Sequence, residues 1–255
     1  MNKKNLLFAL ASVLFMASSC SSHYELTGVQ RDRILVDSRY DKIADAEALA
    51  FIAPYKAHVD SVMCPVVGTT AHEMSSHRPE SELSNLLSDV LVWASADFGE
   101  KPDFAVYNVG GIRASLPKGN VTRGDVLDMA PFENKICFLT LTGEDVNELF
   151  SQIALGGGEG LSHAIKLVIT ADGKLVSASI SGKPVDPNAR YRIATLDYVA
   201  QGNDHMGAFK KKTDVVSPQD EHNNVRFIIE KYFRAKAAAG QTVESRVEGR
   251  VTIQH

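Results

Sequence analysis

The sequence predicts an α+β domain, a mixed sheet with flanking helices, built around one hydrophobic core. Apolar residues at helical spacing alternate with short runs of strand-forming residues, and one pair of these runs flanks an Asp-Gly dipeptide. No repeat of fixed period occurs, which argues against a solenoid or propeller. The chain has 255 residues, of which 44% are hydrophobic and 23% charged, as in an ordinary globular domain.

The first residues are typical of a bacterial lipoprotein signal. Lys3 and Lys4 precede an apolar stretch over residues 6–16, and small residues fill the positions before Cys20. This stretch is shorter than the roughly 20 apolar residues that a mature transmembrane helix needs. We therefore expect a lipid anchor on Cys20, with an ordinary secretion signal as the alternative.

The expected organisation follows from this signal. We predict a signal peptide over residues 1–19, a tether over residues 20–37 and a folded domain over residues 38–255. The lipid would attach the protein to a membrane at the bacterial cell envelope. A net charge of -4 and a pI near 6.1 give no basic surplus, so we expect no binding to nucleic acid.

The first half of the domain contains two predicted helices. Apolar residues spaced three to four apart from Ile43 to Val62 indicate an amphipathic helix that bends near Pro54 and packs against the core. A strand is predicted over residues 65–70, and a second helix from Glu82 to Gly99. Its expected buried stripe contains Leu83, Leu86, Leu87, Val90 and Trp93.

Strands are predicted next over residues 104–107 and 135–142, separated by a glycine-containing loop and a helical turn. Thr142 then opens a helix, and the glycines at 156–158 end it. The inward face of this helix is expected to contain Val146, Leu149, Phe150 and Ile153.

The last part of the chain combines strands with one helix. Residues 165–170 and 175–180 flank Asp172-Gly173 and predict a hairpin. Further strands are expected over residues 191–195 and 250–253. Ser217-Pro218 predicts a helix start. The apolar stripe of that helix would contain Phe227, Ile228, Tyr232 and Phe233.

Two cysteines remain besides Cys20. The spacing of Cys64 and Cys137 fits neither a metal knuckle nor a redox pair, so we expect buried small hydrophobes. A disulfide between them stays open, because sequence does not establish that the backbones approach.

The most informative motif is Asn108-Val109-Gly110-Gly111-Ile112-Arg113, directly after a predicted strand. Adjacent glycines allow a backbone to approach a ligand closely, and arginine offers a planar fork of donors to an oxyanion. Taken alone, the motif also fits a glycine turn followed by a surface arginine.

Three further segments, taken together with this motif, resemble a known family. Residues 131–134 read Pro-Phe-Glu-Asn, residues 139–145 read Leu-Thr-Leu-Thr-Gly-Glu-Asp, and residues 191–204 run from Tyr191 to Asp204. In this order and spacing they closely resemble the C-terminal domain of the 5'-nucleotidase and UDP-sugar hydrolase family. The resemblance runs from about residue 41 to residue 253.

The resemblance implies a nucleotide or nucleoside ligand. In that family two aromatic rings hold the base, and the motifs place them at Phe132 and Tyr198. Because every base has a flat π-face, such stacking tolerates different bases. Asp204 matches the aspartate that accepts the ribose hydroxyls. Asn108 and Arg113, with Gly110 and Gly111 between them, match residues near the phosphate. Arg78 matches a further phosphate contact less closely, and an ordinary surface arginine is the alternative.

The sequence departs from the family in two places. Gly202-Asn203-Asp204-His205 replaces a turn that usually has two glycines before the aspartate and one after it, so the loop is expected to be reshaped. Tyr198 stands where phenylalanine is frequent.

Family enzymes also carry a metallophosphatase domain, and this sequence shows no counterpart of its metal motifs. We expect no catalytic residue, metal ligand or cofactor in this chain, with divalent metals held by a separate metallophosphatase chain. The favoured hypothesis is therefore the nucleotide-recognition subunit of a split 5'-nucleotidase. The alternative is a non-catalytic envelope lipoprotein that binds nucleosides or nucleotides.

Overall fold

The computed structural model describes residues 24–40 and 45–254. By its internal contacts the chain divides into two units, residues 1–51 and 52–255. In the first unit, residues 24–40 form no helix or strand and are exposed. The expected signal segment and Cys20 lie outside the described residues. Across the described part of the chain, every helix is too short or too polar to cross a bilayer.

Helix α2 (Ala46–Met63) runs through Pro54 and has no buried residue. The prediction that its apolar side packs against the core is wrong for the part in the second unit, since Ile52, Tyr55 and Val59 are about half exposed or more. Lys56 and Asp60 form an ion pair one turn apart on this helix. The helical period therefore predicts the helix, but period alone does not show that a helix face is buried.

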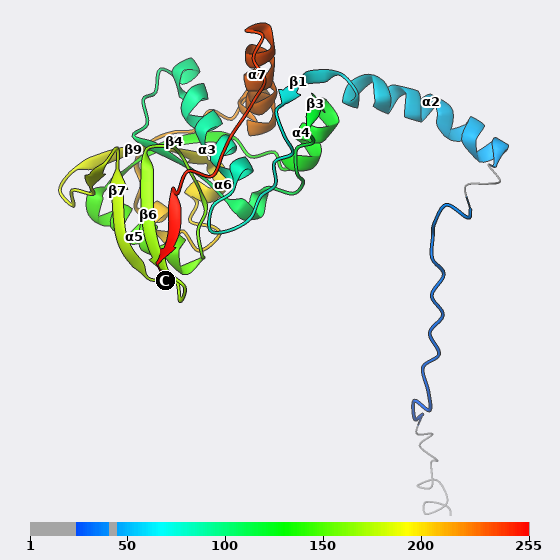
Figure 1. The fold of residues 1–255 in the computed structure, drawn as a ribbon, viewed down its shortest axis with the longest axis horizontal. Helices are drawn as coiled ribbons and strands as arrows, with labels where there is room; N and C mark the ends of the chain where they lie inside the picture. The colour runs from blue at the N-terminus through cyan, green and yellow to red at the C-terminus, as the bar shows by residue number, and fades with distance from the viewer. Residues whose placement is uncertain (1–23, 41–44, 255) are drawn as a thin grey trace, which may run out of the picture. The chain divides into compact units, whose positions relative to one another are not determined.

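The second unit contains three groups of strands, all drawn in Figure 1. A two-stranded sheet pairs β1 (Val66–Thr70) with β3 (Gly119–Thr122). The five-stranded sheet has the order β10 (Thr213–Val216), β4 (Ile136–Thr142), β9 (Arg190–Leu196), β2 (Phe104–Tyr107), β5 (Gly160–Leu161). The four-stranded sheet has the order β11 (Val251–Gln254), β6 (Ile165–Thr170), β7 (Leu175–Ile180), β8 (Lys183–Pro184).

The large sheet is mixed, as predicted. Its central strand β9 pairs in parallel with β2 and antiparallel with β4. Phe104 lies opposite Ile193 on one side, and Ile136 lies opposite Leu196 on the other. The end of β2, the end of β9 and the start of β4 therefore meet at one edge of the sheet.

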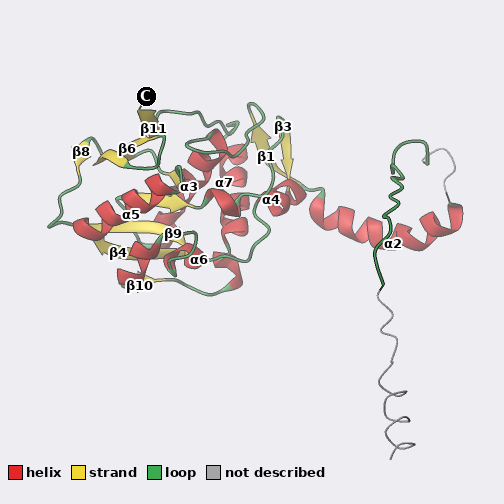
Figure 2. Ribbon diagram, turned by 90° about the horizontal axis from the view of Figure 1, so that it is seen from below, coloured by secondary structure: helices red, strands yellow, loops and turns green. Residues whose placement is uncertain are grey.

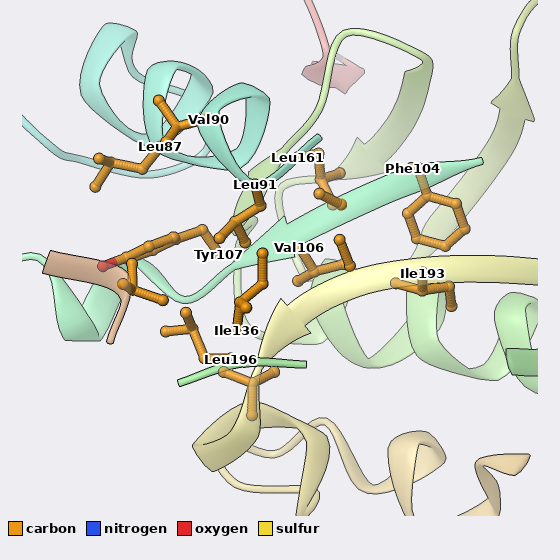
Figure 3. Close-up of a cluster of buried hydrophobic side chains, with 14 of the residues drawn as sticks. Leu87, Val90, Leu91, Phe104, Val106, Tyr107, Ile136, Leu161, Ile193 and Leu196 are labelled. Carbon is orange, nitrogen blue, oxygen red and sulfur yellow. The ribbon is translucent and has the colours of Figure 1, made fainter. Parts of the chain in front are cut away.

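Helix α3 (Glu82–Ala94) packs on this sheet, against β2, β5 and β9. Ser81 caps the helix: its hydroxyl accepts from Ser84 N, and Ser84 in turn caps Ser81 N. Figure 3 shows Leu87, Val90 and Leu91 of α3 above the apolar side chains of β2 and β9. The predicted stripe is confirmed except at Trp93, which is 38% exposed and packs edge-on against Tyr232 at 5.1 Å.

Helix α5 (Gly143–Leu155) contacts β4, β6, β7 and β9, and Figure 2 shows it lying along the strands. Thr142 is its cap and accepts a hydrogen bond from Asp145 N at 3.2 Å. All four residues predicted for its inward face are buried. The hairpin of β6 and β7 has the predicted boundaries.

The predicted helix start at Ser217-Pro218 is wrong. Helix α7 (Val225–Ala238) begins after Asn224, whose side-chain oxygen accepts from Arg226 N at 3.0 Å. Backbone pairing of Val225 N with Asn134 O holds the preceding segment against the residues before β4, and that segment forms a separate 3-10 turn over Glu221–Asn223 before Asn224. Of the predicted stripe, Ile228 and Phe233 are buried, together with Ile229.

The remaining helices are short. They are α4 (Arg123–Met129), α6 (Asp197–Ala200) and the 3-10 turns Ser95–Phe98, Val109–Gly111, Gly207–Lys211 and Glu221–Asn223. Cys137 is buried in β4, as expected, but Cys64 is exposed, so its prediction as a buried hydrophobe is wrong. Cys64 follows the end of α2, which does not enter the core, and both thiols are free.

Candidate functional site

The sheet edge formed by β2, β9 and β4 brings together most of the residues singled out in the sequence. Asn108 directly follows β2, Phe132 precedes β4, and Tyr198 lies in α6 immediately after β9. Lys135 O accepts from Asp197 N at 2.9 Å, and Lys135 N donates to an Asp197 carboxylate oxygen at 3.0 Å. These two bonds fix the segment before β4 to the start of α6.

A cavity of about 300 Å³ opens at this edge. It is lined by Asn108, Gly110, Gly111, Arg113, Phe132, Asn134, Tyr198 and Asp204. Seven of the eight sequence-predicted binding residues are in this set. Sequence reasoning missed Asn134, although it belongs to the same Pro-Phe-Glu-Asn segment that marked Phe132.

The two aromatic rings are not core residues. Phe132 is 48% exposed and Tyr198 is 40% exposed, and both line the same cavity. Large aromatic side chains left this exposed lose much of the free energy that burial would give them. Both rings therefore border the cavity and are not packed in the core.

Asp204 accepts hydrogen bonds from both sides of the cavity. Its Oδ2 accepts from Asn108 Nδ2 at 2.6 Å, and its Oδ1 accepts from the Tyr198 hydroxyl at 3.1 Å. Of the two amide atoms of Asn108, only the nitrogen can donate to a carboxylate, so this contact also fixes the orientation of the amide. Asn108 is 3% exposed, and its Oδ1 is buried without a hydrogen-bond partner among the described residues.

The geometry requires glycine at position 111, whereas position 110 leaves room for a Cβ. A Cβ at Gly111 would lie 2.8 Å from Asn108 Oδ1, and one at Gly110 would lie 3.6 Å from Asp204 Oδ2. A side chain at Gly111 would therefore displace the buried amide that holds Asp204.

Arg113 lies at the outer part of the cavity. Its guanidinium carbon is 5.8 Å from the centroid of the Phe132 ring, and Nη1 donates to Gly110 O at 3.2 Å. The side chain is exposed, so most of its donors face solvent. A planar guanidinium in this position can stack on the ring and still offer its fork to an oxyanion.

Arg78 is not among the residues that line the cavity. Its Nε donates to Gly158 O at 2.8 Å, and its guanidinium pairs with the carboxylate of Glu159. Glu159 is only 4% exposed, and it also accepts from Val109 N at 2.5 Å. Arg78 holds Glu159, and Glu159 in turn binds the backbone of the glycine motif at Val109 N. The sequence signal for Glu159 is a single acidic residue directly after a run of glycines, and sequence reasoning missed this residue.

The loop that carries Asp204 has an unusual backbone. Gly202, Asp204 and His205 have φ values of 85°, 53° and 64°. By residue type, Asn203 tolerates a left-handed backbone better than His205 does. The structure instead places Asp204 and His205 there, while Asn203 donates from Nδ2 to Tyr198 O at 2.7 Å.

The pKa values of two ionisable side chains near the cavity are shifted. The hydrogen bond to Asp204 and the charge of that carboxylate raise the pKa of the Tyr198 hydroxyl. Burial raises the pKa of Glu159, opposed by Val109 N–H and by Arg78. Among the described residues, no group of three or more His, Cys, Asp or Glu side chains could hold a metal ion.

Comparison with known proteins identifies the family of this α+β domain. The family described as "5'-nucleotidase, C-terminal domain" matches residues 66–211, more than half of the chain. The chain belongs to this family.

Relatives of known name match over similar segments. Protein UshA of Yersinia enterocolitica is 30% identical over 163 residues, which cover 63% of this chain and 30% of the relative. Protein UshA of Escherichia coli K12 is 28% identical over 174 residues, covering 67% of this chain and 32% of the relative. The chain thus spans about a third of the length of these relatives.

Solved structures share the fold. The 5'-nucleotidase precursor of Thermus thermophilus matches with a TM-score of 0.67 and 23% identity, covering 82% of this chain and 42% of that chain. The NAD nucleotidase of Haemophilus influenzae matches with a TM-score of 0.61 and 21% identity, covering 82% of this chain and 41% of that chain. These likenesses confirm the predicted fold class.

Glu159→Gln should change how stability depends on pH. Because burial raises the pKa of Glu159 in the folded protein, the folded state binds a proton more readily than the unfolded chain. The stabilising contribution of Glu159 is therefore fully present at low pH and is lost as pH rises through the folded pKa. Urea unfolding at several pH values above about 4 should show the variant gaining stability relative to wild type as pH rises.

Asp172→Asn is a control for which the pH dependence of stability should have the opposite sign. A hydrogen bond from Lys174 lowers the pKa of this exposed carboxyl, so its contribution is present at neutral pH and lost as pH falls. Parallel stability curves for Glu159→Gln and wild type would contradict the assignment of Glu159 as a buried, desolvated carboxyl.

Proposed function

We propose that this domain binds a nucleoside or nucleotide in the cavity at the sheet edge, with the base stacked between Phe132 and Tyr198. The observation that carries the proposal is that two exposed aromatic rings, far apart in the sequence, line one open cavity beside a carboxylate. Stacking on aromatic side chains is worth about 1–3 kcal/mol per base and accepts any base. Membership of the 5'-nucleotidase C-terminal family supports this ligand class.

Polar groups around the rings suit the rest of the ligand. The Asp204 carboxylate, held by buried Asn108, can accept hydrogen bonds from sugar hydroxyls. Gly110 and Gly111 leave the backbone open beside Asp204, and Arg113 can donate to a phosphate with its exposed guanidinium. We assign Arg78 a structural role, because it lies outside the cavity lining and its guanidinium binds Gly158 O and Glu159.

We propose further that phosphate ester hydrolysis, as part of nucleotide catabolism, takes place with a separate metallophosphatase chain. The proposal rests on the 5'-nucleotidase family to which the domain belongs. Divalent metals in that partner would supply an activated water and a clamp on the phosphate. The residues of this domain would bind the base and sugar, and Arg113 would orient the phosphate toward the partner.

Substitutions in the cavity should separate the roles of rings and arginine. Phe132→Ala and Tyr198→Ala should each weaken adenosine binding about tenfold or more, because each removes one face of the stack. Arg113→Ala should weaken AMP binding about tenfold while changing adenosine binding little, because it removes a charge-assisted donor to phosphate. Isothermal titration calorimetry with both ligands measures these effects.

Helix α7 offers matched controls. The Arg226 guanidinium lies 5.6 Å from the Phe227 ring, the same kind of contact as Arg113 on Phe132 but outside the cavity. Arg226→Ala and Phe227→Ala should leave both affinities unchanged. Equal affinities in wild type and the three cavity variants would exclude the assigned roles.

The split arrangement is tested by activity. The mature domain with divalent metal and AMP should release no phosphate alone, and it should lower the KM of a partner metallophosphatase chain when the two are mixed. Phosphate release from the purified domain alone would overturn the split arrangement. Nucleotide binding without any effect on a partner would instead favour the non-catalytic binding protein.

We also propose that Cys20 carries a lipid that anchors the domain at the bacterial cell envelope. The small residues before Cys20 and the short apolar stretch support this assignment. The mass of the mature N-terminal peptide should include the lipid, and Cys20→Ala should move the protein from the membrane fraction to the soluble fraction. An unmodified N-terminus elsewhere in the chain would overturn the anchor.

A further inference from the structure

The Tyr198 hydroxyl occupies an oxygen of the carboxylate that faces the cavity. It donates to Asp204 Oδ1 at 3.1 Å, while Asn108 Nδ2 donates to Oδ2 at 2.6 Å. Both oxygens of Asp204 therefore already accept a hydrogen bond before any ligand enters. A phenylalanine ring at position 198 could stack equally well and would leave Oδ1 free.

The two hydrogen bonds differ in how easily a ligand can displace them. Asn108 is 3% exposed, and its amide is packed against Gly111, so its donor is fixed. Tyr198 is 40% exposed and lies on a four-residue helix at the edge of the cavity. A ligand hydroxyl that needs Oδ1 must therefore share it with Tyr198 or displace the tyrosine proton.

Sugars differ in how many acceptors they require. A ribose with free 2'- and 3'-hydroxyls donates two hydrogen bonds and is best satisfied by both oxygens of one carboxylate. A 2'-deoxyribose donates one from this pair. Each carboxylate oxygen has about two lone-pair positions, so Asp204 keeps one free position on each oxygen beside the bonds already present. A single sugar hydroxyl can use either free position, whereas a diol that binds both oxygens must crowd against the Tyr198 hydroxyl at Oδ1.

We propose that the Tyr198 hydroxyl sets the sugar specificity of this cavity, competing with a ribose diol for Asp204 and so reducing the preference for ribonucleosides over 2'-deoxynucleosides. The inference rests on the proposed nucleoside-binding function. It assigns to the Tyr198 hydroxyl the selection between sugars, which neither the stacking ring nor the aspartate provides alone.

The position of the hydroxyl is set by the fold. Asn203 Nδ2 donates to Tyr198 O at 2.7 Å, and Asp204 has a left-handed backbone that points its carboxylate back toward α6 and Asn108. The phenol and the carboxylate are thus held together by a short loop. The raised pKa of the Tyr198 hydroxyl agrees with a proton held on the phenol by the neighbouring charge.

Tyr198→Phe tests the inference, since it removes only the hydroxyl and retains the ring. Adenosine and 2'-deoxyadenosine are titrated calorimetrically against wild type and variant. The variant should bind adenosine about three- to tenfold more tightly, as expected for freeing one hydrogen-bond acceptor, and should bind 2'-deoxyadenosine within about twofold of wild type. The ratio of the 2'-deoxyadenosine dissociation constant to the adenosine dissociation constant should therefore rise in the variant.

Tyr232→Phe is the matched control, because Tyr232 lies on α7 against Trp93 and outside the cavity. It should leave both dissociation constants unchanged, and melting temperatures should show that both variants are folded. Nucleoside binding with an unchanged ratio, or weaker adenosine binding in Tyr198→Phe, would overturn the inference alone. No binding of either nucleoside to wild type or variant would overturn the proposed function and the inference with it.

Discussion

The cavity depends on the register of β9 with two strands that run in different directions. β2 is parallel to β9, so their ends meet at the same edge, while β4 is antiparallel and begins there, with Ile136 opposite Leu196. A slip of one residue would move the buried side chains of β9 to the other face of the sheet. Packing of the core therefore fixes the edge at which Asn108, Phe132 and Tyr198 meet.

The sequence was most informative where hydrophobic period and end signals agreed. For α5 the inward residues and the Thr142 cap were both predicted and confirmed, and the hairpin of β6 and β7 has its predicted ends because Asp172-Gly173 specifies a tight turn. The residues of the cavity could be identified because their motifs follow one another in the order and spacing of the family. Composition alone would have placed Phe132 in the core.

The errors arose where the outcome depended on a distant partner. The period of α2 defines an apolar side, but none of its residues is buried, and Cys64 beyond it is exposed. Ser217-Pro218 has the chemistry of a helix start, yet pairing of Val225 with Asn134 delays α7 to Asn224. The partner of Arg78 also depends on a distant residue, because Arg78 pairs with Glu159, whose burial the sequence does not show.

The loop that carries Asp204 is held in its conformation by contacts with the rest of the domain. Left-handed backbone at a non-glycine residue costs about 1–3 kcal/mol and persists only where surrounding contacts hold it. Here Asn108, fixed at the end of β2, donates to Asp204, and a Cβ at Gly202 would lie 2.8 Å from the Lys210 side chain of the 3-10 turn that follows. The loop is therefore held by Asn108 at the strand end and by the Asn203 side chain, which donates to Tyr198 O. The Asp204 carboxylate therefore lines the cavity in an orientation that the protein's own hydrogen bonds set, and under the proposed function ligand binding need not supply the free energy of arranging it.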